Sequence, residues 1–212
     1  MQNNKKMDLK IGTTIVAIKF KDGVVVASDK RASAGALLTI DKNTKKIYEI
    51  TDSILLGTAG LVADAQMLAK VLSSELKLKE LRSKIKVTAE EAANLLARIM
   101  YSYKYFPFLT QLIIAGKNKD DYSIYMLDEL GGLTKHEDFI AVGSGMMYAL
   151  GVLETGYKKN MTKEEAKELA KKAILAAIER DLGSGEGIDI YIVSDSGIEK
   201  ETIKIEKKIE KI

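Results

Sequence analysis

The 212-residue chain contains no cysteine. This absence excludes disulfide bonds, thiolate metal sites and a cysteine nucleophile within the sequence. The single histidine, His136, lies in the polar stretch LTKHEDF, and we interpret it as a loop residue. A single histidine nearly excludes a histidine-based catalytic triad and excludes a zinc site with several histidine ligands. We therefore expect no metal site.

Long apolar runs and an excess of one charge are also absent. No run reaches the roughly 18 apolar residues that a membrane-spanning helix needs, and the first residues lack the hydrophobic segment of a secretory signal. The 33 basic and 30 acidic residues leave a net charge of +3, and stretches such as MTKEEAKELAKK have the mixed charge of solvated helix faces. We expect a soluble, cytoplasmic protein with neither a membrane nor a nucleic acid as partner.

What is present is the composition of a globular protein, with 46% apolar and 30% charged residues. Extended patterns occupy residues 13–20, 24–29, 45–50, 53–59, 108–117, 121–133, 139–145 and 188–205, and helical patterns occupy residues 61–84, 88–105, 146–157 and 162–179. The only proline, Pro107, is expected to end the second helix. Strands separated by helix pairs predict an α+β fold, a four-layer αββα sandwich of two packed sheets with helices outside.

The junction Gly12-Thr13-Thr14 at the start of the first strand suggests a chemical role. A threonine hydroxyl is a weak nucleophile until a base accepts its proton, and an α-amino group with an ordinary pKa near 7.7–8.0 is one such base. Thr13 would carry both groups if the bond after Gly12 were cut, and glycine there tolerates strained backbone. Taken alone, the same three residues also fit a strand that follows a terminal tail.

Further motifs accompany this junction. They are GTT at 12–14, ASDKRASAG at 27–35, KKIY at 45–48, GTAGLVADAQ at 57–66, FPFLTQLIIAG at 106–116, LDELGG at 127–132, GSG at 143–145, GVLETGY at 151–157 and ERDLGSGEGIDI at 179–190. Together they resemble the motifs of β-type subunits of the 20S proteasome, most closely the archaeal ones, from residue 12 to about residue 205. The resemblance implies the four-layer fold of the N-terminal nucleophile hydrolases.

The resemblance also implies catalytic roles. Thr13 matches the N-terminal nucleophile, freed by cleavage after Gly12, and Asp29 matches the carboxylate that holds the catalytic lysine, Lys46. A cation beside the Thr13 hydroxyl lowers the pKa of that hydroxyl. Ser144, Asp181 and Ser184 match the polar group that surrounds the threonine amine. Gly60 matches the residue whose backbone N–H binds the oxyanion.

Substrate-binding positions follow from the same resemblance. Ser33 is placed to hydrogen-bond a substrate backbone, and Asp128 is a residue through which a neighbouring subunit would contribute a pocket wall. The pocket for the side chain next to the cut bond matches Ala32, Thr44, Thr58 and Val62. These side chains are small and uncharged, so we expect a preference for apolar residues there.

The chain departs from the family pattern at two places. The segment GALLTIDKNTKK, at 35–46, is one residue longer than the pattern, which leaves Lys45 as an alternative to Lys46. Met146 and Met147 follow GSG where the family often has serine and proline. The start TTIVAI also resembles the simpler bacterial two-ring relative, but DKRASAG, FPFLTQ and GVLETGY favour the archaeal β type.

The resemblance implies a threonine endopeptidase made as a precursor, with residues 1–12 as a propeptide and residues 13–212 as a single domain. It implies heptameric β rings, homo- or hetero-oligomeric and stacked in pairs, with α-type rings as partners, a regulatory ATPase acting indirectly and unfolded polypeptides as substrates. It implies no cofactor. Three alternatives remain: a structural β-type subunit that does not cut, an N-terminal nucleophile amidase acting on small molecules and, more remotely, a nucleic-acid-binding module.

Overall fold

The structure is a computed structural model that describes residues 12–34 and 38–205. Residues 1–11, and with them nearly all of the expected propeptide, lie outside the described residues. The described part contains four helices, α1 (Val62–Ser83), α2 (Ala89–Ser102), α3 (Met146–Gly156) and α4 (Lys163–Arg180). Its strands are β1 (Thr14–Phe20), β2 (Gly23–Asp29), β3 (Ala32–Ala34), β4 (Leu38–Asp41), β5 (Ile47–Glu49), β6 (Ile54–Gly60), β7 (Thr110–Lys117), β8 (Tyr122–Leu127), β9 (Leu133–His136), β10 (Phe139–Gly143), β11 (Gly187–Ser194) and β12 (Gly197–Lys204).

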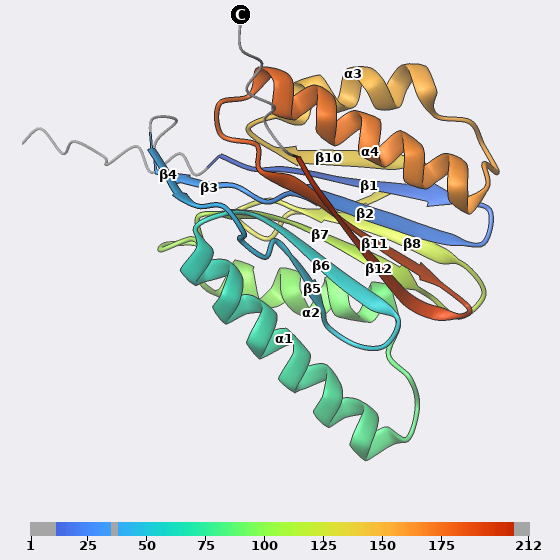
Figure 1. Ribbon diagram of the computed structural model, residues 1–212. Helices are drawn as coiled ribbons and strands as arrows, with labels where there is room; N and C mark the ends of the chain where they lie inside the picture. Colours follow the sequence, from blue (N-terminus) through green and yellow to red (C-terminus); the bar gives the residue numbers. More distant parts are fainter. Residues whose placement is uncertain (1–11, 35–37, 206–212) are drawn as a thin grey trace, which may run out of the picture.

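Two antiparallel five-stranded sheets form the centre of the molecule (Figure 1). The first has the strand order β10-β1-β2-β11-β12, and the second has the order β5-β6-β7-β8-β9. Strands β3 and β4 form a separate hairpin, which the sequence patterns did not predict. Helices α3 and α4 cover the outer face of the first sheet, and α1 and α2 cover the outer face of the second (Figure 1). The expected combination of sheets with helix pairs is confirmed.

The side chains of β1 point alternately into two different apolar clusters, so both faces of the strand are buried. Ile15 and Ala17 belong to the apolar cluster between the two sheets, whereas Val16 and Ile18 belong to the cluster beneath α3 and α4. Successive side chains of a strand point to opposite faces, so a strand buried on both sides needs a continuous apolar run. The run TIVAI provides one, which places β1 in the middle of the molecule.

The helix termini follow local signals in the sequence. Thr88 and Thr162 form capping boxes with Glu91 and Glu165, at the starts of α2 and α4. Helix α2 ends at Ser102, so the prediction that Pro107 ends it was wrong; turns at residues 103–106 have already broken the helical hydrogen bonding. No helix in the described ranges combines the length and apolar character needed to cross a membrane.

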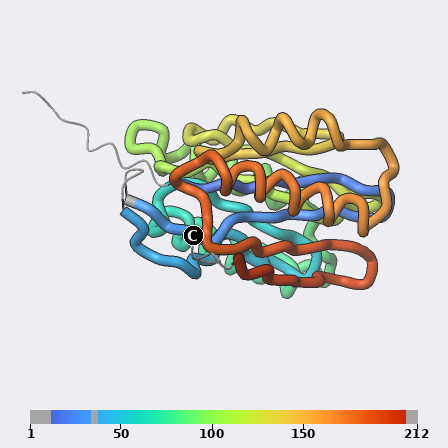
Figure 2. Tube along the Cα trace, turned by 45° about the horizontal axis from the view of Figure 1, so that its top comes forward, coloured from blue at the N-terminus to red at the C-terminus, as the bar shows by residue number. Residues whose placement is uncertain are grey.

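The sheet register brings distant segments to one end of the molecule. Thr14 at the start of β1 lies opposite Gly143 at the end of β10, and Asp29 at the end of β2 lies opposite Ile188 on β11. The segment after α4 and the β3–β4 hairpin lie at this same end in two views (Figures 1 and 2). The predicted site residues are therefore concentrated where these strands begin or end.

Candidate active site

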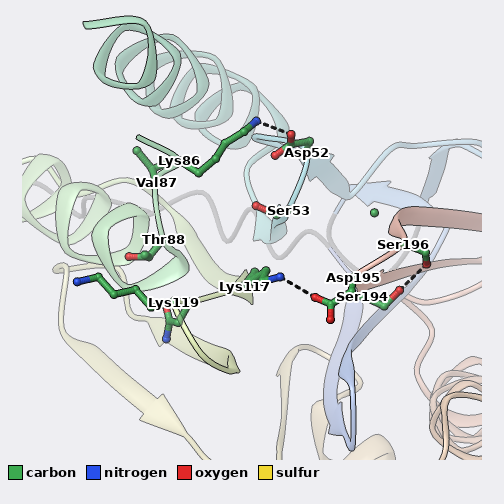
Figure 3. A pocket seen from close by; sticks show the side chains of 12 residues that line it. Asp52, Ser53, Lys86, Val87, Thr88, Lys117, Lys119, Ser194, Asp195 and Ser196 are labelled. Carbon is green, nitrogen blue, oxygen red and sulfur yellow. Dashed lines mark hydrogen bonds and ion pairs between the residues drawn. The ribbon is translucent and has the colours of Figure 1, made fainter. Parts of the chain in front are cut away.

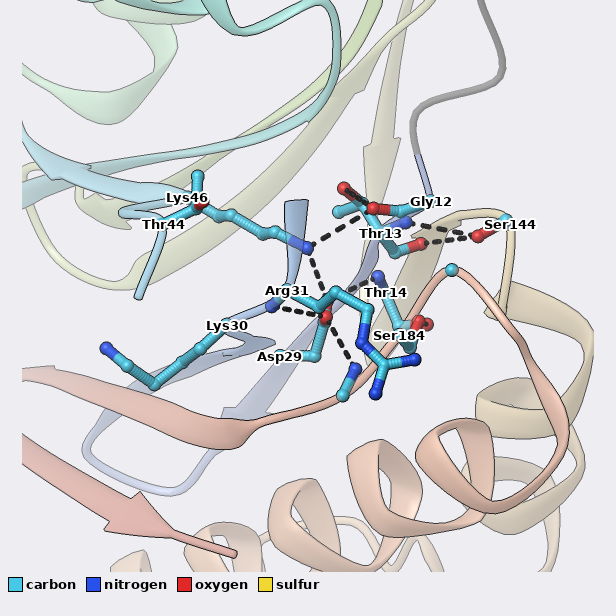
Figure 4. Close-up of polar contacts among 12 residues, drawn as sticks. Gly12, Thr13, Thr14, Asp29, Lys30, Arg31, Thr44, Lys46, Ser144 and Ser184 are labelled. Carbon is cyan, nitrogen blue, oxygen red and sulfur yellow. Dashed lines mark hydrogen bonds and ion pairs between the residues drawn. The ribbon is translucent and has the colours of Figure 1, made fainter. Parts of the chain in front are cut away.

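The carbonyl oxygen of Gly12 receives two donors from the site (Figure 4). Thr13 Oγ1 donates a hydrogen bond to it at 2.7 Å, and Lys46 Nζ donates a longer one at 3.4 Å. On the other side of the same residue, the N–H of Gly12 donates to Ser33 Oγ at 3.1 Å. Thr13 itself is only 2% exposed. The Gly12–Thr13 peptide is thus held in a buried position with its carbonyl facing a hydroxyl and an amine.

Asp29 is a fully buried carboxylate with four hydrogen-bond donors around it. Its Oδ1 accepts from Lys46 Nζ at 2.7 Å and from the N–H of Thr14 at 2.9 Å. Its Oδ2 accepts from the N–H groups of Arg31 and Gly185, at 3.1 and 2.9 Å. A buried charge is tolerated only when it is paired and hydrogen-bonded, and this carboxylate satisfies both conditions.

Lys46 lies at the end of the β4–β5 connection and is almost as buried as its partner Asp29. Burial lowers the pKa of Lys46 below the ordinary lysine value, and the attraction of Asp29 opposes this shift without cancelling it. At a given pH, the neutral fraction of Lys46 is therefore larger than that of an exposed lysine. Despite the additional residue in the 35–46 segment, Lys46 reaches Asp29, whereas Lys45 is exposed, with its Nζ 5.4 Å from the Tyr48 ring centroid.

A second polar group surrounds the nitrogen of Thr13. This backbone N–H donates to Ser144 Oγ at 3.1 Å, and Ser144 Oγ donates to Asp181 Oδ2 at 2.6 Å. Ser184 Oγ donates to the same carboxylate oxygen, also at 2.6 Å. Ser144 lies in the turn between β10 and α3, and Asp181 and Ser184 come from the segment after α4. The three residues that the resemblance placed together are brought together by the structure.

Close backbone contacts at this site require glycine. A Cβ atom at Gly12 would overlap the Cα of Gly183, and a Cβ at Gly183 would overlap the Cα of Gly12. At Gly60, φ is +137° and a Cβ would overlap the carbonyl oxygen of Leu109. Glycine at these positions therefore lets the segment after α4 pack against Gly12, and lets the start of β7 pack against the end of β6.

A pocket opens beside Thr13. It is lined by Thr13, Ala32, Thr44, Lys45, Lys46, Tyr48, Thr58, Gly60, Val62 and Ala65. All four residues predicted for the specificity pocket are among them, as is Gly60. A wider apolar groove continues from this pocket, sharing Ala32, Thr44 and Val62 with it and adding Ile40 and Leu61.

Of the residues predicted to bind substrate, Ser33 lines the adjoining groove, whereas Asp128 lines neither the groove nor the pocket. Its Oδ1 accepts hydrogen bonds from the N–H groups of Leu130 and Gly132, at 2.9 and 2.8 Å, and its side chain is exposed in the β8–β9 turn. Within a single chain, Asp128 is therefore a turn residue. Its expected contribution to the pocket of a neighbouring subunit stays a prediction.

Sequence reasoning missed the role of Arg31. Its guanidinium donates to the carbonyl oxygen of Leu182 at 2.9 Å and to Glu186 Oε1 at 3.0 Å. Both partners flank Ser184, in the glycine-rich stretch LGSGEG. Arg31 therefore ties this segment to the end of β2. The arginine stands two residues after Asp29 in the motif ASDKRASAG, but no local pattern indicates which distant loop it binds.

A separate groove lies at the opposite end of the strands, where β7 turns into β8 and β11 into β12 (Figure 3). Two of its lysines are paired, Lys86 with Asp52 and Lys117 with Asp195. The groove contains none of the predicted site residues. Within the described ranges, no cluster of three or more histidine, cysteine, aspartate or glutamate side chains is arranged to hold a metal ion.

Comparisons with known proteins agree with this geometry. The family model described as "Proteasome subunit" matches residues 9–193. "Proteasome subunit beta" from Nanoarchaeum equitans is 45% identical over 196 residues, covering 92% of this chain and all of that protein. The protein of the same name from Methanocaldococcus fervens is 44% identical over 207 residues, 97% of this chain and 91% of that one. "Proteasome subunit beta 2" from Pyrobaculum arsenaticum is 38% identical over 94% of this chain and 97% of its own.

A match of this extent defines the class: the chain belongs to the proteasome subunit family. Within that family it is a β-type subunit, as the sequence motifs indicated.

Proposed function

We propose that this β subunit is catalytic, a threonine endopeptidase that releases its own nucleophile by cutting the Gly12–Thr13 bond. The observation that carries this proposal is the convergence of the Thr13 hydroxyl and the Lys46 amine on the carbonyl oxygen of Gly12. A subunit with a purely structural role needs neither this convergence nor the buried Asp29–Lys46 ion pair. Buried ion pairs contribute little to stability on balance, so this one points to chemistry.

Self-cleavage begins with attack of Thr13 Oγ1 on the carbonyl carbon of Gly12. The nitrogen of Thr13 still belongs to an amide at this stage and cannot serve as a base. Lys46 is the basic group that touches the same carbonyl, and its lowered pKa increases the neutral share that can take the hydroxyl proton. The C–N bond then breaks, the nitrogen gains a proton, and residues 1–12 are held as an ester on Thr13 Oγ1.

Water completes this reaction. It hydrolyses the ester, which releases residues 1–12 with a C-terminal carboxylate and restores the Thr13 hydroxyl. The new amine of Thr13 then lies where its amide N–H now contacts Ser144, within reach of the Ser144–Asp181–Ser184 group. Nucleophile and base are from then on carried by one residue.

The same groups suit hydrolysis of a substrate peptide. The Thr13 α-amine takes the proton of Thr13 Oγ1 as the oxygen attacks the substrate carbonyl carbon, and the N–H of Gly60 binds the developing oxyanion. The departing amine of the substrate takes that proton as the C–N bond breaks, which leaves the substrate as an ester on Thr13 Oγ1. Water, activated through the freed amine of Thr13, then hydrolyses the ester and restores the hydroxyl. The present contact between the Gly12 N–H and Ser33 Oγ indicates how Ser33 binds a substrate backbone. The pocket lined by Ala32, Thr44, Thr58 and Val62 receives the side chain before the cut bond.

Family membership also supports proposals on the fold type, the propeptide, the assembly and the location of this subunit. We assign the paired sheets and helix pairs to the four-layer αββα fold of N-terminal nucleophile hydrolases, with residues 1–12 as propeptide and residues 13–212 as one domain. The names of the relatives, subunits of a proteasome, support assembly of this chain into a particle. We extend this to two stacked heptameric β rings, α-type rings as partners, an ATPase that delivers unfolded polypeptides, and a cytoplasmic location.

The test is co-expression of this chain with α-type subunits from the same organism, followed by intact mass measurement of the β chain. We expect loss of residues 1–12 in the wild type, full length in a Thr13→Ala variant, and hydrolysis of fluorogenic peptides by the wild-type particle alone. A full-length wild-type chain inside an assembled, inactive particle would overturn the proposal in favour of the structural subunit. Activity without a large assembly would instead favour the amidase.

A further inference from the structure

The hydrogen bonds around Thr13 do not stop at the residues considered so far, because they continue to Thr14. Thr14 Oγ1 lies 2.7 Å from Ser184 Oγ, and the backbone N–H of Thr14 donates to Asp29 Oδ1 at 2.9 Å (Figure 4). Thr14 has no exposed surface. One residue thus contacts both polar groups of the site, the one that holds Lys46 and the one that surrounds the Thr13 nitrogen.

The direction of these hydrogen bonds follows from the chemistry of the groups. A carboxylate oxygen accepts, so the hydroxyl proton of Ser184 points to Asp181 Oδ2. Ser184 has then used its only proton, and Thr14 must be the donor in the Thr14–Ser184 bond. Donation from Thr14 strengthens the bond that Ser184 makes to Asp181, because hydrogen bonds in a chain polarise one another.

The position of this hydroxyl is fixed by the surrounding backbone. On β1 the side chain of Thr14 faces the same layer as Val16, two residues later, which is the layer of α3 and α4. A Cβ atom at Gly145 would overlap Thr14 Oγ1, so the glycine before α3 leaves the space that the hydroxyl occupies.

Packing alone does not explain a hydroxyl here. The four residues that follow Thr14 on β1, Ile15 to Ile18, are apolar and buried, and valine has nearly the shape of threonine. Burying a hydroxyl costs free energy unless it finds a partner, and Thr14 finds one that belongs to the site.

We propose that Thr14 is a positioning residue of the peptidase, with its hydroxyl holding Ser184 and its N–H holding Asp29. The inference rests on the proposed function and deepens it. Thr14 is not the nucleophile, the lysine or a member of the serine–aspartate group, and we assign to it the role of holding these groups in their relative positions. Thr14 touches neither the cut bond nor the substrate pocket, and it acts through Ser184 and Asp29.

The experiment compares Thr14→Val, which keeps the shape and removes the hydroxyl, with Thr14→Ser, which keeps the hydroxyl and removes a methyl group. Each is co-expressed with α-type subunits, and kcat and KM are measured on a fluorogenic peptide with the assembled particle. We expect kcat to fall about 10- to 100-fold in Thr14→Val with KM within about twofold, and Thr14→Ser to stay within about threefold of the wild type. Ser123→Ala, which removes a buried hydroxyl on β8, is the control and should assemble and cut normally.

A double variant separates positioning from general loss of structure. If Thr14 acts through Ser184, adding Thr14→Val to Ser184→Ala should lower kcat by less than about threefold further, because groups that act as a unit are not additive. Full additivity of the two changes would overturn the inference, and so would a Thr14→Val particle with wild-type kcat. Absence of cleavage in the wild type would instead overturn the proposed function.

Discussion

The amine of Lys46 lies 2.7 Å from the carboxylate of Asp29, and the two side chains are only 4% and 0% exposed. The partners are not equivalent in their surroundings. Asp29 keeps three backbone N–H donors when Lys46 is removed, whereas the one acceptor left to Lys46 among residues 12–34 and 38–205 when Asp29 is removed is the distant carbonyl oxygen of Gly12. This asymmetry predicts which of the two residues, when replaced, lowers the stability of the subunit more.

We expect Asp29→Ala to destabilise the subunit more than Lys46→Met. The first change leaves a buried cation and three N–H groups without their acceptor, at a cost of about 3–5 kcal/mol. The second leaves a carboxylate that is still hydrogen-bonded, at a cost of about 1–3 kcal/mol. Thermal unfolding of the two variants, followed by circular dichroism in a Thr13→Ala background so that no chain is processed, gives the order. A larger loss for Lys46→Met would contradict the asymmetry.

Self-cleavage should accelerate as the pH rises towards the pKa of Lys46. Burial lowers this pKa, and below it the neutral share of Lys46 grows about tenfold per pH unit. The measurement is the rate of loss of residues 1–12 by intact mass, in particles assembled at low pH and then shifted to a series of higher pH values. A rate independent of pH would show that Lys46 does not take the hydroxyl proton.

The same lowered pKa has a consequence for stability. Between the pKa of Lys46 in the folded chain and its ordinary value of 10.5, the unfolded chain binds more protons at this residue than the folded chain does. The contribution of Lys46 to the free energy of unfolding therefore rises with pH across that window. The difference between wild type and Lys46→Met, measured by urea unfolding at several pH values, isolates this residue from the other lysines. A difference that falls with pH would contradict the direction of the shift.

The contact between Gly12 and Gly183 should matter more before cleavage than after it, when the nearest remaining neighbour of a Cβ at Gly183 is the Ser144 hydroxyl. A Cβ at either position overlaps the Cα of the other, so Gly12→Ala and Gly183→Ala should each slow self-cleavage at least about tenfold by displacing the peptide from Thr13. In a chain produced to begin at Thr13, residue 12 is absent, and Gly183→Ala should then retain most of the peptidase activity. Equal losses in both forms would assign Gly183 a role beyond this contact.

Filling the pocket at Ala32 should change the preference for the residue before the cut bond. Ala32 lines both the pocket beside Thr13 and the groove that continues from it. We expect Ala32→Leu to lower kcat/KM about tenfold or more for peptides with leucine at that position, and less for peptides with alanine. Leu81→Ala, an exposed residue near the far end of α1, is the matched control. An equal loss for both peptides would indicate general damage to the site.

Local patterns in the chain were sufficient for the main elements and for the family. The extended pattern that begins at residue 13 and the helical patterns at 61–84 and 162–179 are each read over a few residues, and the structure has strands and helices there. The end of α2, the β3–β4 hairpin and the place of His136, interpreted as a loop residue but paired with Ile124 in β9, escaped this reading. All three depend on turns and short pairings whose preferences are weak compared with tertiary contacts.

The site residues themselves could be selected only through spaced motifs, because nothing local distinguishes Asp29 from any other aspartate at the end of a strand. Folding brings its carboxylate to Lys46, 17 positions later, and to Gly185, 156 positions later. The same holds for Arg31 and for the hydroxyl of Thr14, whose partner lies 170 residues away. Such contacts are set by the register of β1 against β2 and β10 and by where α4 ends, which depend on how the layers pack together.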